Sequence, residues 1–340
     1  MEEKMLAAVF EGEGKFILKE VPVPRAQKDD DVIVRVEAVS ICGTDVHIVE
    51  VPPGFIAKPN TILGHELAGI VEQVGKSVNT VKPGDRVVVN PNYFCGVCHY
   101  CKLNLPNHCE NLCALGINID GAFAKYCKVS ERVCHKISHS ISADIAAFGE
   151  PLACVINGTQ KVRIQPGESS VILGAGPIGI LFLRMFKVSG ASKVVVSEPS
   201  EYRRGFAKEC GADVIVDPVS ENLQDVVLSE IPGSADIVVD TVGSLFGEGA
   251  KLLRRGGKLL VFGVNRKAVA QFPQCEVTFR ELQILGSWLA NASFPVAVSV
   301  IESGALNLGK LITHKFPLER IHEGIELLAQ GKAIKVIINP

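Results

Sequence analysis

The chain has 340 residues, 47% of them hydrophobic, and its 35 basic residues nearly balance its 37 acidic ones. This composition excludes a disordered chain, and the length predicts two domains rather than one core. A net charge of −2 gives no reason to expect a nucleic-acid partner. The odd count of 11 cysteines favours a reducing cytoplasm, and the longest apolar run, residues 171–183, is too short and too rich in glycine to span a membrane.

The first third of the chain consists of short β-like runs separated by turns, which predict a small β-barrel-like domain. The expected strands are residues 5–10, 32–39, 70–74 and 86–89. A turn at Lys82-Pro83-Gly84-Asp85 precedes the last of them.

Within residues 90–111, four cysteines follow the spacing C-x2-C-x2-C-x7-C. They are Cys95, Cys98, Cys101 and Cys109. Thiolates so spaced favour a tetrahedral zinc site, which has no position left for substrate and therefore supports structure rather than catalysis. Two disulfides or four unrelated thiols are the alternatives. His99 and His108 in the same segment could replace a cysteine, although solvated histidines fit better because four thiolates already complete the tetrahedron.

From about residue 143 onward, apolar strands alternate with segments of helix length. The expected strands are residues 170–173, 193–197, 214–216, 236–240 and 258–262. This alternation predicts a doubly wound parallel sheet with helices on both faces. Two helical stretches and a final strand at residues 334–338 complete the chain.

A glycine-rich motif lies between the first of these strands and the helix after it. Its members are Gly174, Ala175, Gly176, Pro177, Ile178 and Gly179. The first glycine permits a tight turn, the second lets a pyrophosphate approach the backbone, and the third allows the helix to pack on the sheet. This context predicts a dinucleotide site.

Glu198 ends the next strand, 24 residues after Gly174, where a carboxylate can accept both ribose hydroxyls. This position favours NAD over NADP, because a 2′-phosphate would be repelled. Arg203 and Arg204 follow closely and could soften that preference, or they could be solvated residues of a first helical turn.

Three further segments offer metal ligands: residues 40–47, 64–66 and 149–154. One thiolate, one imidazole and one carboxylate would hold zinc with a position open for substrate, and such a zinc acts as a Lewis acid.

The motifs together resemble the zinc-dependent medium-chain dehydrogenases, in the order and spacing of that family. The resemblance rests on Cys42-Gly43-Thr44-Asp45, Gly64-His65-Glu66, the four-cysteine segment, the turn at Lys82 and the glycine motif. It covers essentially the whole chain and implies a GroES-like β-barrel catalytic domain joined to a Rossmann domain. The expected domains are residues 1–148, with the zinc loop at 90–111, then 149–286 for NAD, and a tail at 287–340 that returns to the first domain.

The resemblance also implies roles for individual residues. Cys42, His65 and Glu150 would bind a catalytic zinc, with Glu66 as an exchangeable neighbour, so that each chain would hold two zinc ions. Thr44 would contact the substrate oxygen and His47 would relay the proton. Cys154 lies four residues after Glu150 on the same helical face, so it either competes for the metal or is a buried, inert thiol.

The segment Glu150-Pro151-Leu152 resembles the polyol and sorbitol dehydrogenase branch, which implies a polyhydroxylated substrate and a homotetramer or homodimer. Animal sorbitol dehydrogenases have an arginine where this chain has Leu289, which argues against sorbitol itself. L-threonine 3-dehydrogenase is the alternative enzyme, since it shares the residue 42–47 motif. A regulatory nucleotide-binding zinc protein is the non-enzymatic alternative.

Overall fold

A computed structural model describes residues 3–340, which divide into two compact units. The first unit joins the chain up to Ala153 with Ala290–Pro340, and the second is Cys154–Leu289. We expected the second domain at residues 149–286. The first boundary instead falls inside helix α4 (Gly149–Val162), because this helix runs without interruption from one unit into the other.

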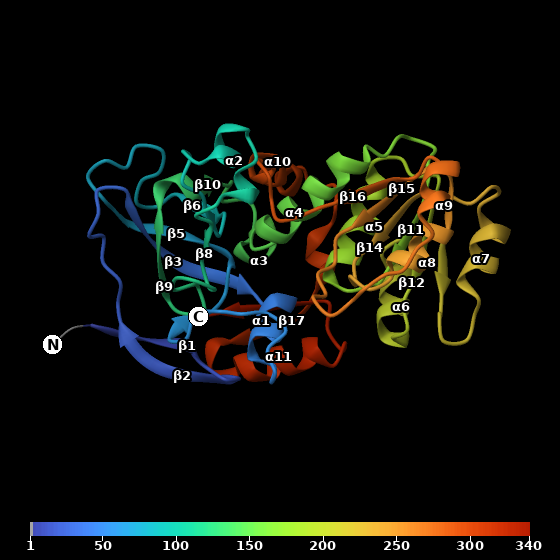
Figure 1. Cartoon of the computed structure of the whole chain (residues 1–340). Helices are drawn as coiled ribbons and strands as arrows, with labels where there is room; N and C mark the ends of the chain where they lie inside the picture. Colours follow the sequence, from blue (N-terminus) through green and yellow to red (C-terminus); the bar gives the residue numbers. More distant parts are fainter. Residues whose placement is uncertain (1–2) are drawn as a thin grey trace. The chain divides into compact units, whose positions relative to one another are not determined.

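The first unit is built mainly from strands (Figure 1). Its strands are β1 (Lys4–Gly12), β2 (Lys15–Pro22), β3 (Asp31–Ser40), β4 (Thr61–Ile62), β5 (Glu66–Val74), β6 (Arg86–Val89), β7 (Asn92–Tyr93), β8 (Cys113–Ala114), β9 (Tyr126–Ser130), β10 (Cys134–Lys136), β17 (Ile312–Pro317) and β18 (Lys335–Asn339). Its helices are α1 (Gly43–Val49), α2 (His99–Lys102), α3 (Ala143–Ala146), α10 (Phe294–Ser303) and α11 (Ile321–Ala329).

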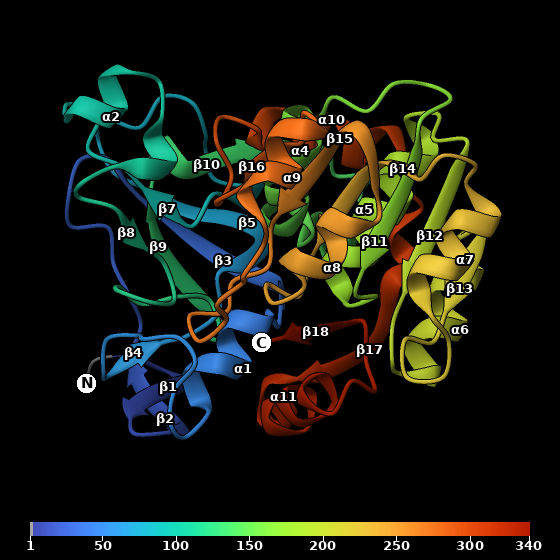
Figure 2. The ribbon, with the colours of Figure 1, turned by 45° about the vertical axis from the view of Figure 1, so that its right-hand side comes forward.

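Strand β3 organises this unit, because it pairs antiparallel with β5, β9 and β18. The main sheet has the order β10-β6-β5-β3-β18-β17, with β9 on β3 as well, and β2-β1-β4 form a second sheet. Helix α11 lies beside β17 and β18 (Figure 2). The last strand of the chain therefore completes the sheet that the early strands begin.

The second unit is a parallel sheet with the order β13-β12-β11-β14-β15-β16. Its strands are β11 (Ser169–Leu173), β12 (Lys193–Ser197), β13 (Val214–Val216), β14 (Ala235–Asp240), β15 (Leu253–Val261) and β16 (Gln283–Gly286). The helices between them are α5 (Pro177–Val188), α6 (Glu201–Glu209), α7 (Leu223–Glu230), α8 (Phe246–Lys251) and α9 (Gln274–Phe279).

Helices cover both faces of this sheet, which explains why its central strands are apolar without alternation. A methyl group added at Gly158 of α4 would contact Phe182 of α5 and Leu260 of β15. One added at Gly249 of α8 would instead meet Leu259, the neighbour of Leu260 on the opposite face. The strand order and the two helical layers confirm the expected doubly wound fold.

Several strands were not predicted, among them β2, β9 and β17. The burial of β2 and β17 is mostly partial, and β9 is short, so none of them produces a long apolar run. None of the helices in the described part of the chain combines the length and the apolar character that crossing a bilayer requires.

Candidate active site

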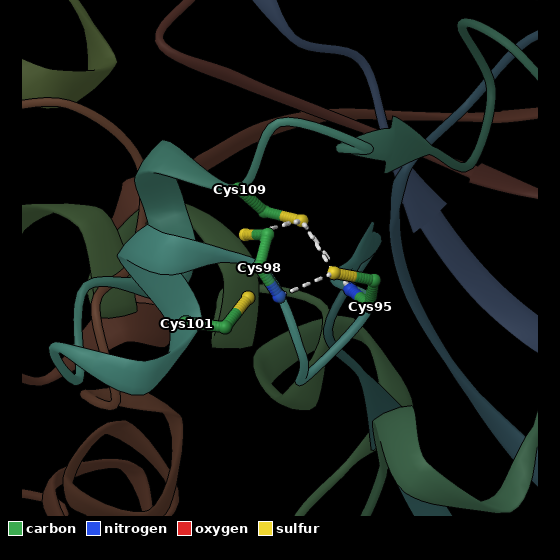
Figure 3. Close-up of side chains that lie close together, drawn as sticks. All are labelled: Cys95, Cys98, Cys101 and Cys109. Carbon is green, nitrogen blue, oxygen red and sulfur yellow. Dashed lines mark hydrogen bonds between the residues drawn. The ribbon is translucent and has the colours of Figure 1, made fainter.

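The four cysteines of the predicted structural site converge in space. The sulfur atoms of Cys95, Cys98, Cys101 and Cys109 all lie within 4.8 Å of one another. Figure 3 shows the four side chains grouped close together. The sulfurs of Cys95 and Cys109 are 3.6 Å apart, and those of Cys98 and Cys109 are 3.9 Å apart. Both separations are far beyond a disulfide bond, so the arrangement fits a tetrahedral metal site and not the disulfide alternative.

The backbone around these cysteines prepares them unequally for metal binding. The N–H groups of Val97 and Cys98 lower the pKa of Cys95 to about 6, whereas burial raises the pKa of Cys101 to about 12. Four thiolates at this distance repel one another, so a cation is needed for all four to ionise together. Neither His99 nor His108 belongs to the cluster; both rings instead contact Tyr100.

A second group of ligands lies in the first unit at the ends of β3 and β5. Ligand atoms of Cys42, His65 and Glu66 lie within 4.8 Å of one another. The sequence positions His65 by means of Gly64, whose φ is +88° and whose added Cβ would lie 2.8 Å from the ring of Phe123. Only glycine fits this position, which holds the chain close to Phe123 immediately before the histidine.

Cys42 is fixed by the start of helix α1. Its thiol accepts a hydrogen bond from Thr44 N–H at 3.4 Å, and its own N–H donates to the carboxylate of Asp45 at 2.9 Å. This reciprocal capping sets the direction of the sulfur before any metal binds.

Asp45 also faces His65. Its Oδ1 is 3.6 Å from Nδ1 of His65, both side chains are buried, and neither atom has a hydrogen-bond partner among residues 3–340. A carboxylate behind one nitrogen of an imidazole is the usual support for a metal on the other nitrogen. Burial alone would lower the pKa of His65, but the negative charges of Asp45, Cys42 and Glu150 raise it well above its ordinary value. Burial raises the pKa of Cys42 and of Asp45, so a cation bound here would favour the ionised forms of these acidic groups.

Glu66 has a partner that sequence reasoning missed. Its Oε2 accepts a hydrogen bond from the hydroxyl of Ser40 and forms an ion pair with Nζ of Lys335, and the Lys335 and Glu66 side chains are each only 2% exposed. Lys335 also lies over the ring of Phe148, with Nζ 5.5 Å from the ring centroid. The one visible signal in the sequence is a lysine within the apolar segment 333–338.

The other predicted carboxylate, Glu150, lies in the first turn of α4 and is buried. Its charge raises the pKa of His65, although its oxygens are not among the three ligand atoms that cluster most tightly. Cys154, one turn further along α4, is buried and belongs to neither of the two clusters of the described residues. The choice between Glu150 and Glu66 as the third ligand stays a prediction.

The two residues expected to handle the proton lie on α1. Thr44 is half-buried in its first turn, beside Cys42. The side chain of His47 is 55% exposed, and its Nδ1 lies 3.1 Å from both carboxylate oxygens of Glu50. An exposed imidazole beside a carboxylate can exchange protons with water.

The glycine motif in the second unit has the geometry of a phosphate-binding turn. Gly174 has φ of +97°, and a Cβ on Gly179 would lie 2.0 Å from the carbonyl oxygen of Gly174. Pro177 begins helix α5, and Gly176, Pro177 and Ile178 are partly exposed, so an anion can approach this end of the helix.

Glu198 is turned toward this loop. Its Oε2 accepts a hydrogen bond from Ala175 N–H at 2.7 Å, and its Oε1 accepts one from Ser200 N–H at 2.9 Å. Each oxygen keeps a second lone pair with which it could accept a ribose hydroxyl.

The two arginines after Glu198 differ in their surroundings. Arg204 is engaged with backbone carbonyls and with Asp217, at 3.1 Å. Arg203 has a buried Nε without a hydrogen-bond partner in the described chain, and its Nη1 is 3.9 Å from the position of a Cβ on Gly176. Of the two arginines, Arg203 is therefore the one whose side chain lies at the glycine loop.

Comparisons with known proteins agree with this geometry. Residues 28–139 match the model of the alcohol dehydrogenase GroES-like domain, and residues 177–303 match that of the zinc-binding dehydrogenases. Sorbitol dehydrogenase of Bombyx mori is 32% identical, over 98% of this chain and 98% of its own. The chain is a zinc-dependent medium-chain dehydrogenase. It is therefore an oxidoreductase that acts on an alcohol CH–OH group, which sets aside the regulatory alternative.

Two further similarities bear on what this dehydrogenase acts on. L-threonine 3-dehydrogenase of Thermococcus kodakarensis is 36% identical, over 95% of this chain and 94% of its own. The crystal structure of a zinc-binding dehydrogenase of Sinorhizobium meliloti bound to NADP has a TM-score of 0.95 and 31% identity, over 100% of both chains. The sorbitol dehydrogenase relative places the dehydrogenase near the polyol branch.

Proposed function

We propose that this dehydrogenase oxidises a secondary hydroxyl of a polyol, sugar or sugar acid and transfers the hydride to NAD. The observation that carries the proposal is the cluster of half-buried Cys42 with buried His65 and Glu66, together with the effect of the Glu150 charge on the pKa of His65. A donor set of one thiol, one imidazole and carboxylates suits zinc with a position left open for substrate.

When bound, zinc would supply Lewis-acid stabilisation of negative charge on the substrate oxygen. We assign Cys42, His65 and Glu150 as its ligands. Glu66, restrained by Ser40 and Lys335, presents an acceptor beside the site that suits a second substrate hydroxyl. This acceptor is the reason for preferring a polyhydroxylated substrate to a simple alcohol.

The proton of the substrate hydroxyl needs a path to water. Thr44 is placed next to Cys42 and supplies a hydroxyl that can both accept and donate. His47 is exposed and held by Glu50, so it can release the proton to solvent. We therefore assign Thr44 as the contact to the substrate oxygen and His47 as the outer relay.

For the coenzyme we propose NAD, bound at the loop from Gly174 to Gly179 with its adenosine ribose on Glu198 and Arg203. The buried carboxylate of Glu198 disfavours an extra phosphate at this position. For the second metal we propose a structural zinc on the four cysteines, which gives two zinc ions per chain.

The test follows NADH absorbance with zinc-loaded protein against hexitols, pentitols, inositols, aldonic acids and L-threonine. We expect turnover of a polyhydroxylated compound and its loss in Glu150→Ala. Because Cys154 lies on the same helix one turn away, Cys154→Ala is the matched control and should retain activity. Turnover that survives Glu150→Ala would show that Glu150 is not an essential ligand.

L-threonine is the second candidate substrate. The 36% identity to the Thermococcus kodakarensis enzyme, together with the shared motif at residues 42–47, favours it. Turnover of threonine alone in the same panel would assign the protein to that enzyme.

We also expect a homo-oligomer in a reducing compartment. The edge strand β16 exposes its outer residues, including Ile284 at 38%, which favours contact with a second copy. None of the cysteines in residues 3–340 forms a disulfide, which agrees with a reducing environment. Sedimentation velocity of the full chain measures the oligomeric state.

A further inference from the structure

The first unit contains a large hollow that the proposed reaction does not use. Its volume is about 800 Å³, within the range typical of sites for small molecules. It lies beside β1, β2 and β9, and none of the candidate zinc ligands lines it.

The floor of this hollow is apolar. Val9, Ile62 and Val129 line it and are themselves buried, and Val21 adds a half-buried wall from β2. A floor of this kind favours an apolar ligand body, because filling it removes hydrocarbon surface from water.

The rim has the opposite character and carries positive charge. Five cationic and three acidic residues line the hollow, a formal charge of +2 in a chain whose net charge is −2. Four of the cations form no ion pair and no side-chain hydrogen bond within residues 3–340. They are Arg25, Lys28, Lys128 and Arg132.

The three acids are instead held by the protein. Asp31 accepts hydrogen bonds from Gln27 N–H at 2.9 Å and Lys28 N–H at 2.8 Å. Asp30 accepts one from the hydroxyl of Ser130, and Asp120 accepts one from Ile62 N–H. The three carboxylates therefore hydrogen-bond within the protein, while the four cationic side chains can contact a ligand.

A neutral donor completes the lining. The hydroxyl oxygen of Tyr93 accepts a hydrogen bond from Ser130 N–H at 3.2 Å, so its own proton is free to be donated. Burial raises the pKa of Tyr93, which keeps that proton in place at neutral pH.

We infer that this hollow binds an amphipathic anion: an apolar body that fills the floor, with a carboxylate, sulfonate or phosphate group at the cationic rim. The inference does not depend on the proposed substrate, because the hollow and the candidate zinc site share no residue.

The probe is anilinonaphthalene sulfonate, whose fluorescence rises on transfer to an apolar site. It is titrated into the zinc-loaded full chain with NAD at saturation, so that the coenzyme site is blocked. We expect one saturable site that persists under NAD. The neutral analogue N-phenylnaphthylamine should bind about tenfold more weakly, because it lacks the anionic group.

Variants then locate the site. Lys128→Glu combined with Arg132→Glu should weaken binding of the sulfonate about tenfold and leave the neutral analogue unchanged. Lys76→Glu combined with Lys310→Glu makes the same charge change at exposed residues outside the hollow and should alter neither affinity. Val21→Trp fills the hollow and should abolish binding of both the sulfonate and its neutral analogue. Circular dichroism checks that the variant is folded.

Three results would overturn the inference. The first is that saturating NAD abolishes all binding of the probe. The second is that the Lys128→Glu, Arg132→Glu variant binds the sulfonate probe as tightly as the Lys76→Glu, Lys310→Glu control. The third is that Val21→Trp dissociates an oligomer in sedimentation velocity, since the hollow would then be covered by a second copy.

Discussion

Replacement of Lys335 by methionine tests the electrostatic account of the candidate zinc site most directly. Methionine keeps an unbranched apolar stem against Phe148 but removes the charge that pairs with Glu66. Loss of one member of a buried ion pair leaves the other charge uncompensated, at a cost of about 3–5 kcal/mol. Because the hydroxyl of Ser40 still donates to Glu66, we expect the lower end, about 3 kcal/mol, in the zinc-free protein.

The control comes from the neighbouring strand. Lys315 of β17 pairs with Asp144, but its side chain is 55% exposed, so Lys315→Met should cost about 0–1 kcal/mol. The double variant Glu66→Gln with Lys335→Met removes both charges and should recover most of the loss.

Hydrogen exchange with mass spectrometry can measure this effect in β3 and β18, the paired strands nearest the lesion. A loss of about 3 kcal/mol corresponds to roughly 100-fold faster exchange of amides that open with the whole unit. Bound zinc should reduce the difference in exchange rate between Lys335→Met and wild type, because the metal ion then supplies a positive charge beside Glu66. The reasoning fails if Lys335→Met exchanges no faster than Lys315→Met, or if zinc leaves the difference unchanged.

Three other outcomes are expected. Cys98→Ser should lower the zinc content from two ions to one per chain by metal analysis, whereas Cys113→Ser, outside both ligand clusters, should leave it unchanged. Gly179→Ala should weaken NAD binding more than tenfold in fluorescence titration, because the added Cβ would lie 2.0 Å from the carbonyl oxygen of Gly174. Gly205→Ala is the control and should leave NAD binding unchanged, because no atom lies within 4 Å of the Cβ position at Gly205. In zinc-free protein, the rate of alkylation of Cys95 by iodoacetamide should rise with pH through a midpoint near pH 6, because only the thiolate reacts and the pKa of Cys95 is about 6. Cys101 has a pKa of about 12 and should stay unreactive until far higher pH. Equal reactivity of the two thiols would refute this prediction.

Local sequence patterns sufficed for much of the fold. Buried strands such as β11, β12 and β14 are continuous apolar runs, and Gly174, Gly176 and Gly179 occur where a strand meets a helix. In each case the residues that define the element lie next to one another in sequence, so the pattern carries the structural information. The four-cysteine site is similar, because its ligands lie within one short loop.

Contacts between distant parts of the chain could not be predicted in this way. The ion pair of Glu66 with Lys335 joins residues 269 positions apart, and no spacing rule connects them. The approach of Asp45 to His65 depends on how β3 and β5 bring α1 and Gly64 together. Strand β17 escaped prediction because its burial comes from pairing with β18 rather than from its own composition.

The pairing of β18 with β3 also constrains the order of events during synthesis. Ser40 of β3 pairs with Ile337 of β18, so roughly 300 further residues must be synthesised before β3 can pair with β18. At about 5–20 residues per second, a ribosome needs on the order of 15–60 seconds for that interval. The second unit is contiguous and can fold during it. Glu66 meanwhile has no ammonium partner until Lys335 emerges, so a nascent or truncated chain has an incomplete metal site, and a defect late in translation would affect the site that the earliest residues encode.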